Sequence, residues 1–266
     1  MQKDYIDTPK SNQTENEFVE SYWSMKWEAV DFKANTERVF RQAEYKILSK
    51  YLPSNKEHFS ILDGGCGLGE WVIALEQQNY DVTGVDISAV TIAALELLKS
   101  RSNFITGDIR SLPFPSNYFN LYFSWGVFEH FEAGPQDCLR EAFRVIQADG
   151  ILVISVPFFN LRHAAASVFG KNLIFPSNQR FYQYRYTRQE IAKELVIAGF
   201  DILDVHLIHK KSGCLRFLHH SLGLPYRWVL TRILANFLSY LVPGFLLAHM
   251  VLIVARKRNG SNEIRG

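Results

Sequence analysis

The chain has 266 residues, of which 47% are hydrophobic and 21% are charged, so it can bury a sizeable core as one domain, with or without an inserted subdomain. Its three cysteines, Cys66, Cys138 and Cys214, lie far apart and form no CxxC pair, which argues against a zinc site or disulfide framework and suits a reducing cytosol. The first 16 residues are polar, and no signal peptide is predicted. We therefore expect a cytoplasmic globular protein.

Charge is distributed unevenly along the chain. Residues 1–149 carry 22 acidic and 14 basic side chains, whereas residues 150–262 carry 4 acidic and 14 basic ones. Halves of opposite sign indicate either an anionic partner for the second half or attraction between the halves themselves, and the sequence leaves both open.

Residues 1–35 are predicted to form an N-terminal cap that is partly flexible. The first 20 residues are polar and expected to be loose, but the stretch 18–27 holds four aromatic side chains, which could pack on the core or on a ligand. Thr36–Tyr51 carries apolar residues on one face and predicts an amphipathic helix.

A glycine-rich turn follows the first core strand. Residues 59–63 predict a short strand, residues 64–69 a turn and residues 70–78 a helix. Glycines at every second position of the turn allow positive φ angles and close approach of a ligand to the backbone. The next predicted strand, Asp81–Asp86, ends in an acid that can accept hydrogen bonds from ribose hydroxyls.

Strands and helices then alternate. Strands are predicted at 103–106, 119–124 and 151–156, with helices from Ser88 and Pro135 between them. This alternation predicts parallel βαβ units, whose ligands bind beyond the carboxyl ends of the strands. A single site is expected there, because four polar or aromatic residues follow strand ends: Asp63, Asp86, Asp108 and Trp125.

Five segments in order resemble the motifs of class I S-adenosylmethionine-dependent methyltransferases. They are Asp63 with the glycines of 65–69, Gly84-Val-Asp86, Gly107-Asp108, residues 119–130 and residues 139–154. The resemblance covers about residues 36–157. The dinucleotide fingerprint fits less well, because its third glycine would fall on Glu70.

The resemblance implies an α/β, Rossmann-like fold with a mostly parallel seven-stranded sheet and helices on both faces. The methyltransferase domain would span residues 36–257, followed by a flexible tail at 258–266. Insertions are expected after strand 5, at about 158–186, and between strands 6 and 7, at about 211–242. The last strand, His249–Arg256, would lie antiparallel between the fifth and sixth.

The same resemblance implies S-adenosyl-L-methionine as the cofactor. The glycine-rich loop would accommodate its methionine part, Asp86 its ribose, and the residues after the third strand its adenine. The implied cofactor-binding residues are Asp63, Gly65, Cys66, Gly67, Gly69, Asp86, Ile87, Asp108, Ile109 and Trp125. Structural roles as helix caps or turn residues are the alternative for Asp63 and Asp108.

His130 is the candidate catalytic base, because methylation of a hydroxyl needs a proton acceptor near neutral pKa. A hydrogen-bonded structural role for this histidine is equally open. Some similar enzymes that methylate quinone precursors use a Glu-x-x-Glu-His motif for a metal. The first glutamate of that motif is replaced here by Gly126, so we predict no metal.

The second half is apolar and basic. Residues 210–240 could form a buried subdomain or dock on an anionic membrane, which would make the protein peripheral at the inner face. The uncharged run 233–255 is long enough to span a bilayer, although Pro243-Gly244 divides it.

We therefore predict a methyltransferase acting on a small or lipid-linked acceptor. The alternatives are an NAD-type oxidoreductase and a non-catalytic methyltransferase-like scaffold. We do not expect a nucleic-acid partner, since no RNA-binding module is recognisable. The sequence determines neither the acceptor atom nor the oligomeric state.

Overall fold

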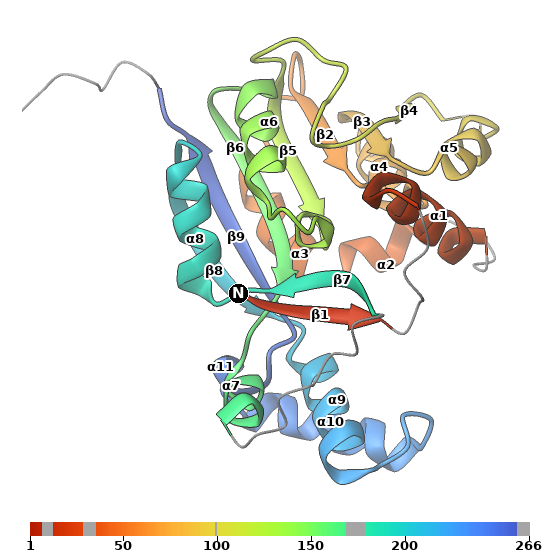
Figure 1. The fold of residues 1–266 in the computed structure, drawn as a ribbon. Coiled ribbons are helices and arrows are strands. Elements are labelled where there is room, and N and C mark those ends of the chain that lie inside the picture. The colour runs from red at the N-terminus through yellow and green to blue at the C-terminus, as the bar shows by residue number, and fades with distance from the viewer. Residues whose placement is uncertain (7–12, 29–35, 99, 169–178, 260–266) are drawn as a thin grey trace, which may run out of the picture.

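The computed structural model describes residues 1–6, 13–28, 36–98, 100–168 and 179–259. Its centre is a seven-stranded sheet in the order β4-β3-β2-β5-β6-β9-β8 (Figure 1). In chain order its strands are β2 (Ser60–Gly64), β3 (Asp81–Asp86), β4 (Asn103–Thr106), β5 (Phe119–Trp125), β6 (Ile146–Pro157), β8 (Phe200–Ile208) and β9 (Met250–Lys257). The predicted fold class is confirmed.

The strand directions also follow the expectation. Strands β4, β3, β2, β5 and β6 pair in parallel, and β9 lies antiparallel between β6 and β8. One boundary was wrong: the strand predicted at 151–156 begins five residues earlier, because the helix before it ends at Val145. Ile146 is already extended and pairs with Phe119, so β6 begins there.

Helices cover both faces of the sheet. One face packs against α6 (Gln136–Val145) and α8 (Arg188–Ile197), which Thr187 begins with a capping box. The other packs against α2 (Thr36–Phe40), α3 (Ala43–Leu48), α4 (Glu70–Gln77) and α5 (Ala89–Glu96). The single helix expected over 36–51 is therefore interrupted, because Gln42 is extended; the break lets the rings of Phe40 and Tyr45 meet edge to face.

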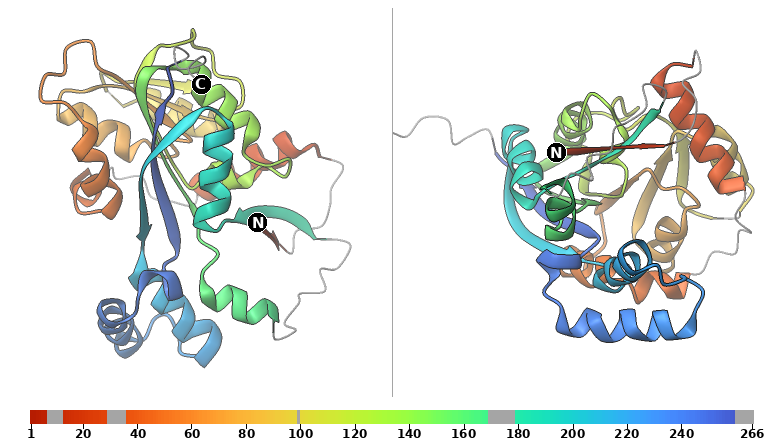
Figure 2. Two further views of the ribbon diagram at one scale, coloured as in Figure 1. Left: turned by 90° about the vertical axis from the view of Figure 1, so that its left-hand side faces the viewer. Right: turned by 60° about the horizontal axis from the view of Figure 1, so that its bottom comes forward.

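The N-terminus is not loose at its beginning. β1 (Gln2–Ile6) pairs antiparallel with β7 (Arg180–Arg185) in a separate two-stranded ribbon. Arg185 of β7 and Asp4 of β1 form an ion pair at 2.7 Å, which ties the ribbon together. Helix α1 (Glu15–Glu28) follows and lies beside the ribbon, over the carboxyl ends of β2 and β3 (Figures 1 and 2).

A group of helices lies beyond the carboxyl ends of β6 and β8 (Figure 2). It contains α7 (Leu161–Val168), α9 (Lys210–Leu222), α10 (Val229–Leu241) and α11 (Gly244–Leu247), with a small apolar core of its own around Cys214 and Leu218. No helix in the described ranges is long and apolar enough to cross a bilayer. Residues 233–255, considered above as a span, are divided among α10, α11 and β9.

Candidate functional site

The glycine-rich loop after β2 turns toward the end of β3. Gly65 and Gly67 have φ angles of 81° and 48°, which glycine adopts without steric cost. The N–H groups of Gly65 and Cys66 both donate to the Val85 carbonyl, at 2.7 and 2.9 Å. A Cβ atom on Gly65 would lie 2.4 Å from Cγ2 of Val127, so this position needs glycine for space as well.

Asp86 lies beneath the loop with its carboxylate fixed by backbone donors. It accepts from the N–H of Gly67 at 2.8 Å and from the N–H of Ser88 at 2.9 Å. Burial raises the pKa of Asp86, and these N–H groups oppose the rise. A carboxylate has about four acceptor positions, so these bonds leave acceptor capacity for a hydroxyl group of a ligand.

Asp63 is the second buried carboxylate at this end of the sheet. Burial, and then the charge of Asp86, raise the pKa of Asp63 well above its usual value. No ion pair joins either carboxylate to a basic side chain among the residues that the structure describes. Two buried acids of like charge favour a cationic ligand, which would allow both to ionise.

A cavity of about 480 Å³ lies above these groups. Its volume falls in the range of small-molecule sites. The structure brings together at its walls His130 and all but one of the predicted cofactor-binding residues: Asp63, Gly65, Cys66, Gly67, Asp86, Ile87, Asp108, Ile109 and Trp125.

Gly69 is the predicted residue that does not line this cavity. It lies at the start of α4 with a φ of 68°. A Cβ atom there would meet Phe104 at 2.9 Å, so its neighbours are core side chains. In this structure Gly69 therefore shapes the turn that leads into α4 and does not contact the cavity.

Asp108 is held by a neighbouring arginine. Nε of Arg110 lies 3.0 and 3.1 Å from its two carboxylate oxygens, and Nη2 lies 2.6 Å from one of them. The same guanidinium contacts Glu15 of α1 at 3.4 Å. The loop after β4 is thereby tied to the N-terminal cap.

Helix α1 closes the cavity, and sequence reasoning left its residues out of the site. Val19, Trp23 and Trp27 all line the cavity, and the two indoles stack at 5.6 Å. Ser24 hydrogen-bonds Ser88 at 2.7 Å, which anchors α1 at the end of β3. The run of aromatic residues at 18–27 was the sequence feature that could have indicated this wall. Its residues contribute both to the cavity wall and to the buried core.

His130 lies on the wall with one ring nitrogen engaged. Its Nδ1 is 2.7 Å from the carbonyl oxygen of Tyr182. Because a carbonyl only accepts, Nδ1 carries the proton of the neutral ring and Nε2 is the basic nitrogen. Burial lowers the pKa of His130 to about 4, against the opposing effect of the Tyr182 and Gly126 carbonyls. The ring is therefore neutral at pH 7.

Glu129 is buried beside this ring. Its Oε1 lies 3.9 Å from Nε2 of His130, and its Oε2 has no hydrogen-bond partner within the described ranges. Burial raises the pKa of Glu129 to about 8, so the carboxyl is protonated at pH 7. Glu129 and His130 thus form a neutral pair, not an ion pair.

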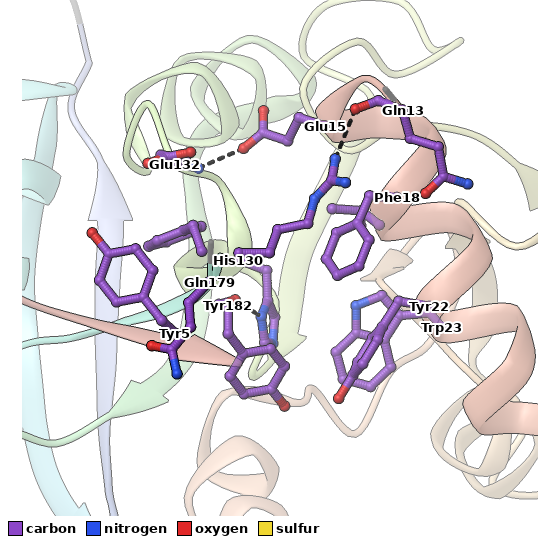
Figure 3. A pocket seen from close by; sticks show the side chains of 13 residues that line it. Tyr5, Gln13, Glu15, Phe18, Tyr22, Trp23, His130, Glu132, Gln179 and Tyr182 are labelled. Carbon is purple, nitrogen blue, oxygen red and sulfur yellow. Dashed lines mark hydrogen bonds between the residues drawn. The ribbon is translucent and has the colours of Figure 1, made fainter. Parts of the chain in front are cut away.

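A second cavity of about 240 Å³ adjoins the first. The two share Val19, Trp23 and His130 as walls. Figure 3 shows Phe18, Tyr22 and Trp23 of α1 on one side and Tyr182 near His130 on the other. The Trp23 and Tyr182 rings meet the His130 ring edge-on, at 5.1 and 5.0 Å. We call this aromatic space the side cavity.

No group of three or more metal-ligating side chains is present in the part of the chain that the structure describes. Gly126, where the similar quinone enzymes have a glutamate, has a φ of 69° and lies next to Glu129. The expectation of no metal stays a prediction.

Residues 62–154 match the family model described as a methyltransferase domain. A ubiquinone/menaquinone biosynthesis C-methyltransferase from Campylobacter jejuni is 27% identical over 192 residues, covering 62% of this chain and 78% of the relative. A 2-methyl-6-phytyl-1,4-hydroquinone methyltransferase from Oryza sativa is 29% identical over 126 residues, covering 46% and 37%. The NAD-type and scaffold alternatives find no support in these matches.

The fold also matches solved structures. The PH0226 protein from Pyrococcus horikoshii superposes with a TM-score of 0.59 at 16% identity, covering 88% of this chain and 99% of that one. At this identity the match concerns the fold alone.

Proposed function

We propose that this chain, which belongs to the class I S-adenosylmethionine-dependent methyltransferases, methylates a largely apolar small or lipid-linked acceptor bound in the side cavity. The observation that carries the proposal is the junction of the two cavities at His130 and Trp23. A methyl donor in the larger cavity and an acceptor in the smaller one would meet there. Methyl transfer depends mainly on such positioning.

The residues of the larger cavity fit S-adenosylmethionine. The donor carries an ammonium and a sulfonium, and the buried Asp63 and Asp86 lack a cationic partner. We assign the ammonium to Asp63 and the ribose hydroxyls to Asp86, which lines the cavity. Asp108 and Ile109 would border the adenine, and Trp125 would close the cavity wall. When bound, the cofactor supplies the electrophilic methyl group.

We assign proton acceptance to His130 at the cavity junction. The basic Nε2 of His130 can take a proton, while its Nδ1–H keeps the ring oriented on the Tyr182 carbonyl. With a pKa of about 4, His130 is a weak base and suits an acceptor whose proton becomes acidic as the methyl bond forms. Glu129, with a pKa of about 8, is already protonated at pH 7, so it cannot receive that proton and keeps the surroundings of the base uncharged.

The acceptor class follows from the walls of the side cavity. Phe18, Tyr22, Trp23, Phe181 and Tyr182 give it aromatic surfaces suited to a ring or an unsaturated chain, beside polar residues that include Glu15 and Arg180. The two relatives described above are named for quinone biosynthesis and for a phytyl hydroquinone. Both names are compatible with an isoprenoid or aromatic acceptor for this chain.

The outer face of α10 could dock on a membrane, which would suit an enzyme with a lipid-linked acceptor. Its small residues Thr231 and Ala235 are buried, whereas six apolar side chains are each at least 58% exposed: Val229, Leu230, Ile233, Phe237, Tyr240 and Leu241. Large apolar patches of this kind mark interaction surfaces. Arg232 of α10 and Arg227 just before the helix are exposed, and residues 210–240 contain no acid. An anionic membrane surface at the inner face of the cell membrane would satisfy both the apolar and the basic side chains.

Turnover is tested by release of S-adenosylhomocysteine from the full chain with pools of quinols, isoprenoid lipids and other small acceptors. Calorimetry with S-adenosylmethionine and with NAD identifies the cofactor independently of the acceptor. We expect binding of S-adenosylmethionine alone. Binding of NAD, or of neither compound, would overturn the assignment.

Membrane docking is tested by sedimentation with vesicles of increasing anionic lipid content. Binding should rise with anionic lipid, fall with salt, and drop in the Ile233→Ser/Phe237→Ser and Arg227→Gln/Arg232→Gln variants. Leu97→Ser is the matched control, because Leu97 is an exposed apolar residue at the end of α5, outside the α10 patch. This variant should bind vesicles as wild type does. Protein that stays in the supernatant at low salt on strongly anionic vesicles would refute docking.

A further inference from the structure

Basic side chains from four segments gather beneath the β1–β7 ribbon. They are Arg162 and His163 of α7, Arg185 of β7, Arg216 of α9 and His249 just before β9, and we call them the basic cluster. Figure 1 shows α7, α9 and α11 on the side of this ribbon away from α1. None of these residues lines the two cavities described above.

A histidine between two guanidinium groups lies at the centre of the cluster. Nε2 of His163 is 3.0 Å from Nη2 of Arg162 and 2.8 Å from Nη1 of Arg185. Since a guanidinium only donates, Nε2 accepts from both and the ring proton lies on Nδ1. That Nδ1 and Nε of Arg162 are buried and have no hydrogen-bond partner in the described residues. The cluster is rich in donors and short of acceptors.

Acids near the cluster are scarce. Asp4 pairs with Arg185 at 2.7 Å, and no ion pair joins either of the other two arginines to an acid within the described part of the chain. The segments around the cluster cannot supply one, because residues 150–189 and 205–262 contain no Asp or Glu. The positive charge is therefore largely uncompensated by the protein itself.

The titration of the cluster agrees with this shortage. Burial, followed by the charges of Arg185 and Arg162, lowers the pKa of His163 to about 3. Burial, followed by the charge of Arg216, lowers the pKa of His249 to about 3 as well. Both histidines are neutral at pH 7, so the arginines carry the charge and repel one another unless an anion lies among them.

Tyr182 connects the cluster to the side cavity. Its ring lines that cavity, 5.0 Å from the ring of His130. Arg185 of the cluster, whose guanidinium contacts His163 at 2.8 Å, lies three residues from Tyr182 on the same strand β7. A ligand could therefore reach the cluster at one end and the methyl-transfer position at the other.

We propose that the basic cluster binds a phosphate or diphosphate group of the methyl acceptor, whose apolar remainder extends past Tyr182 toward His130. Converging guanidinium groups suit a phosphate, because each offers several donors to its oxygens and the group carries more charge than a carboxylate. This assignment rests on the proposed function and specifies its substrate class.

The test uses the full chain and two soluble probes, inorganic pyrophosphate and decyl phosphate, in titration calorimetry at low salt. Wild type should bind both, and decyl phosphate more tightly because of its apolar chain. Arg216→Gln and Arg162→Gln should each weaken binding about tenfold or more, as expected for loss of a charge-assisted contact. Arg188→Gln, exposed on α8, is the matched control and should bind as wild type.

Three results would overturn the proposal: no binding of either probe by wild type, wild-type affinity in both cluster variants, or a loss in the control as large as in the cluster variants. Because Arg216 is exposed, its variant should fold even if Arg162→Gln does not, and circular dichroism verifies this. A parallel titration with S-adenosylmethionine separates the two proposals, since its failure refutes the enzyme assignment and leaves phosphate binding standing.

A last arm distinguishes a soluble phosphate from a lipid surface. Phosphatidylcholine vesicles containing phosphatidic acid are sedimented with the same variants. If the cluster variants lose vesicle binding but keep wild-type affinity for both soluble probes, the cluster serves surface attraction and the head-group assignment is wrong. Loss of affinity for the soluble probes supports it.

Discussion

The Glu129→Gln substitution keeps the size of a buried side chain and removes its ability to ionise. Glu129 is 2% exposed, and burial raises its pKa from 4.5 to about 8. Between these values the unfolded chain has released a proton that the folded protein retains. The folded protein therefore loses stability as pH rises from about 4.5 to about 8. Glutamine does not titrate, so the variant should not show this loss.

The magnitude follows from the separation of the two pKa values. Each pH unit between them is worth about 1.4 kcal/mol, so the full penalty is about 5 kcal/mol above pH 8. At pH 5 the unfolded carboxyl is only just ionised, and the penalty is about 1 kcal/mol. The free energy of unfolding of Glu129→Gln, relative to wild type, should increase by about 4 kcal/mol between pH 5 and pH 8.5.

Urea denaturation of both proteins at the two pH values measures this difference. The buried histidines, whose lowered pKa values make the fold less stable as pH falls below about 6.5, are present in both proteins and cancel in the comparison. Glu96→Gln, an exposed glutamate on α5, is the control and should show no such pH dependence. A relative stability of Glu129→Gln that stays constant with pH would mean that the pKa of Glu129 is not raised in the fold, and the neutral state assigned to Glu129 would be wrong.

Three further predictions concern the two cavities. Asp86→Ala should weaken S-adenosylmethionine binding by about 1.5–3 kcal/mol, measured by calorimetry; an unchanged dissociation constant in a folded variant would remove Asp86 from the ribose site. Gly67→Val should abolish cofactor binding while circular dichroism stays native, because residue 67 has a φ of 48° and a Cβ there would lie 2.9 Å from the Trp27 ring. Normal binding by that variant would make the loop a simple turn. His130→Ala should lower turnover about a hundredfold with cofactor affinity unchanged, and turnover within about twofold of wild type would leave His130 a structural residue.

The central sheet was predictable because its signals are local. Asp63 and Asp86 each end a short apolar strand, and the glycines between them leave little choice of backbone. The same carboxyl-end rule brought Asp108 and Trp125 to the cavity. The placement of β9 between β6 and β8 came from family resemblance, since nothing in an isolated apolar strand specifies its neighbours.

The N-terminal segment could not be predicted in the same way. β1 contains only Tyr5 and Ile6 as large apolar residues, and its partner β7 lies more than 170 residues away in the chain. Pairing at that separation leaves no periodic signal in the strand itself. The wall formed by Trp23 and Trp27 was equally hidden, because aromatic residues on a helix predict burial but not whether a core or a ligand provides it.

Helix α10 illustrates a different limit. Its sequence is apolar almost all round, and such a helix reads as buried. In the structure the buried residues of α10 are the small Thr231 and Ala235, so most of the larger side chains face outward. Composition gives the amount of apolar surface, whereas only the packing shows which part of it remains for a partner.

The opposite charges of the two halves now have a structural interpretation. Two described ion pairs join an acid of the first half to a basic side chain of the second: Asp4 with Arg185, and Glu44 with His209. Attraction between the halves thus uses only a small part of the charge. Unpaired acids lie instead at the cofactor cavity, and unpaired arginines lie at the basic cluster beyond Tyr182. A cationic methyl donor at the acidic end and an anionic acceptor at the basic end would each meet complementary charge, and binding of either ligand would relieve repulsion that the empty protein contains.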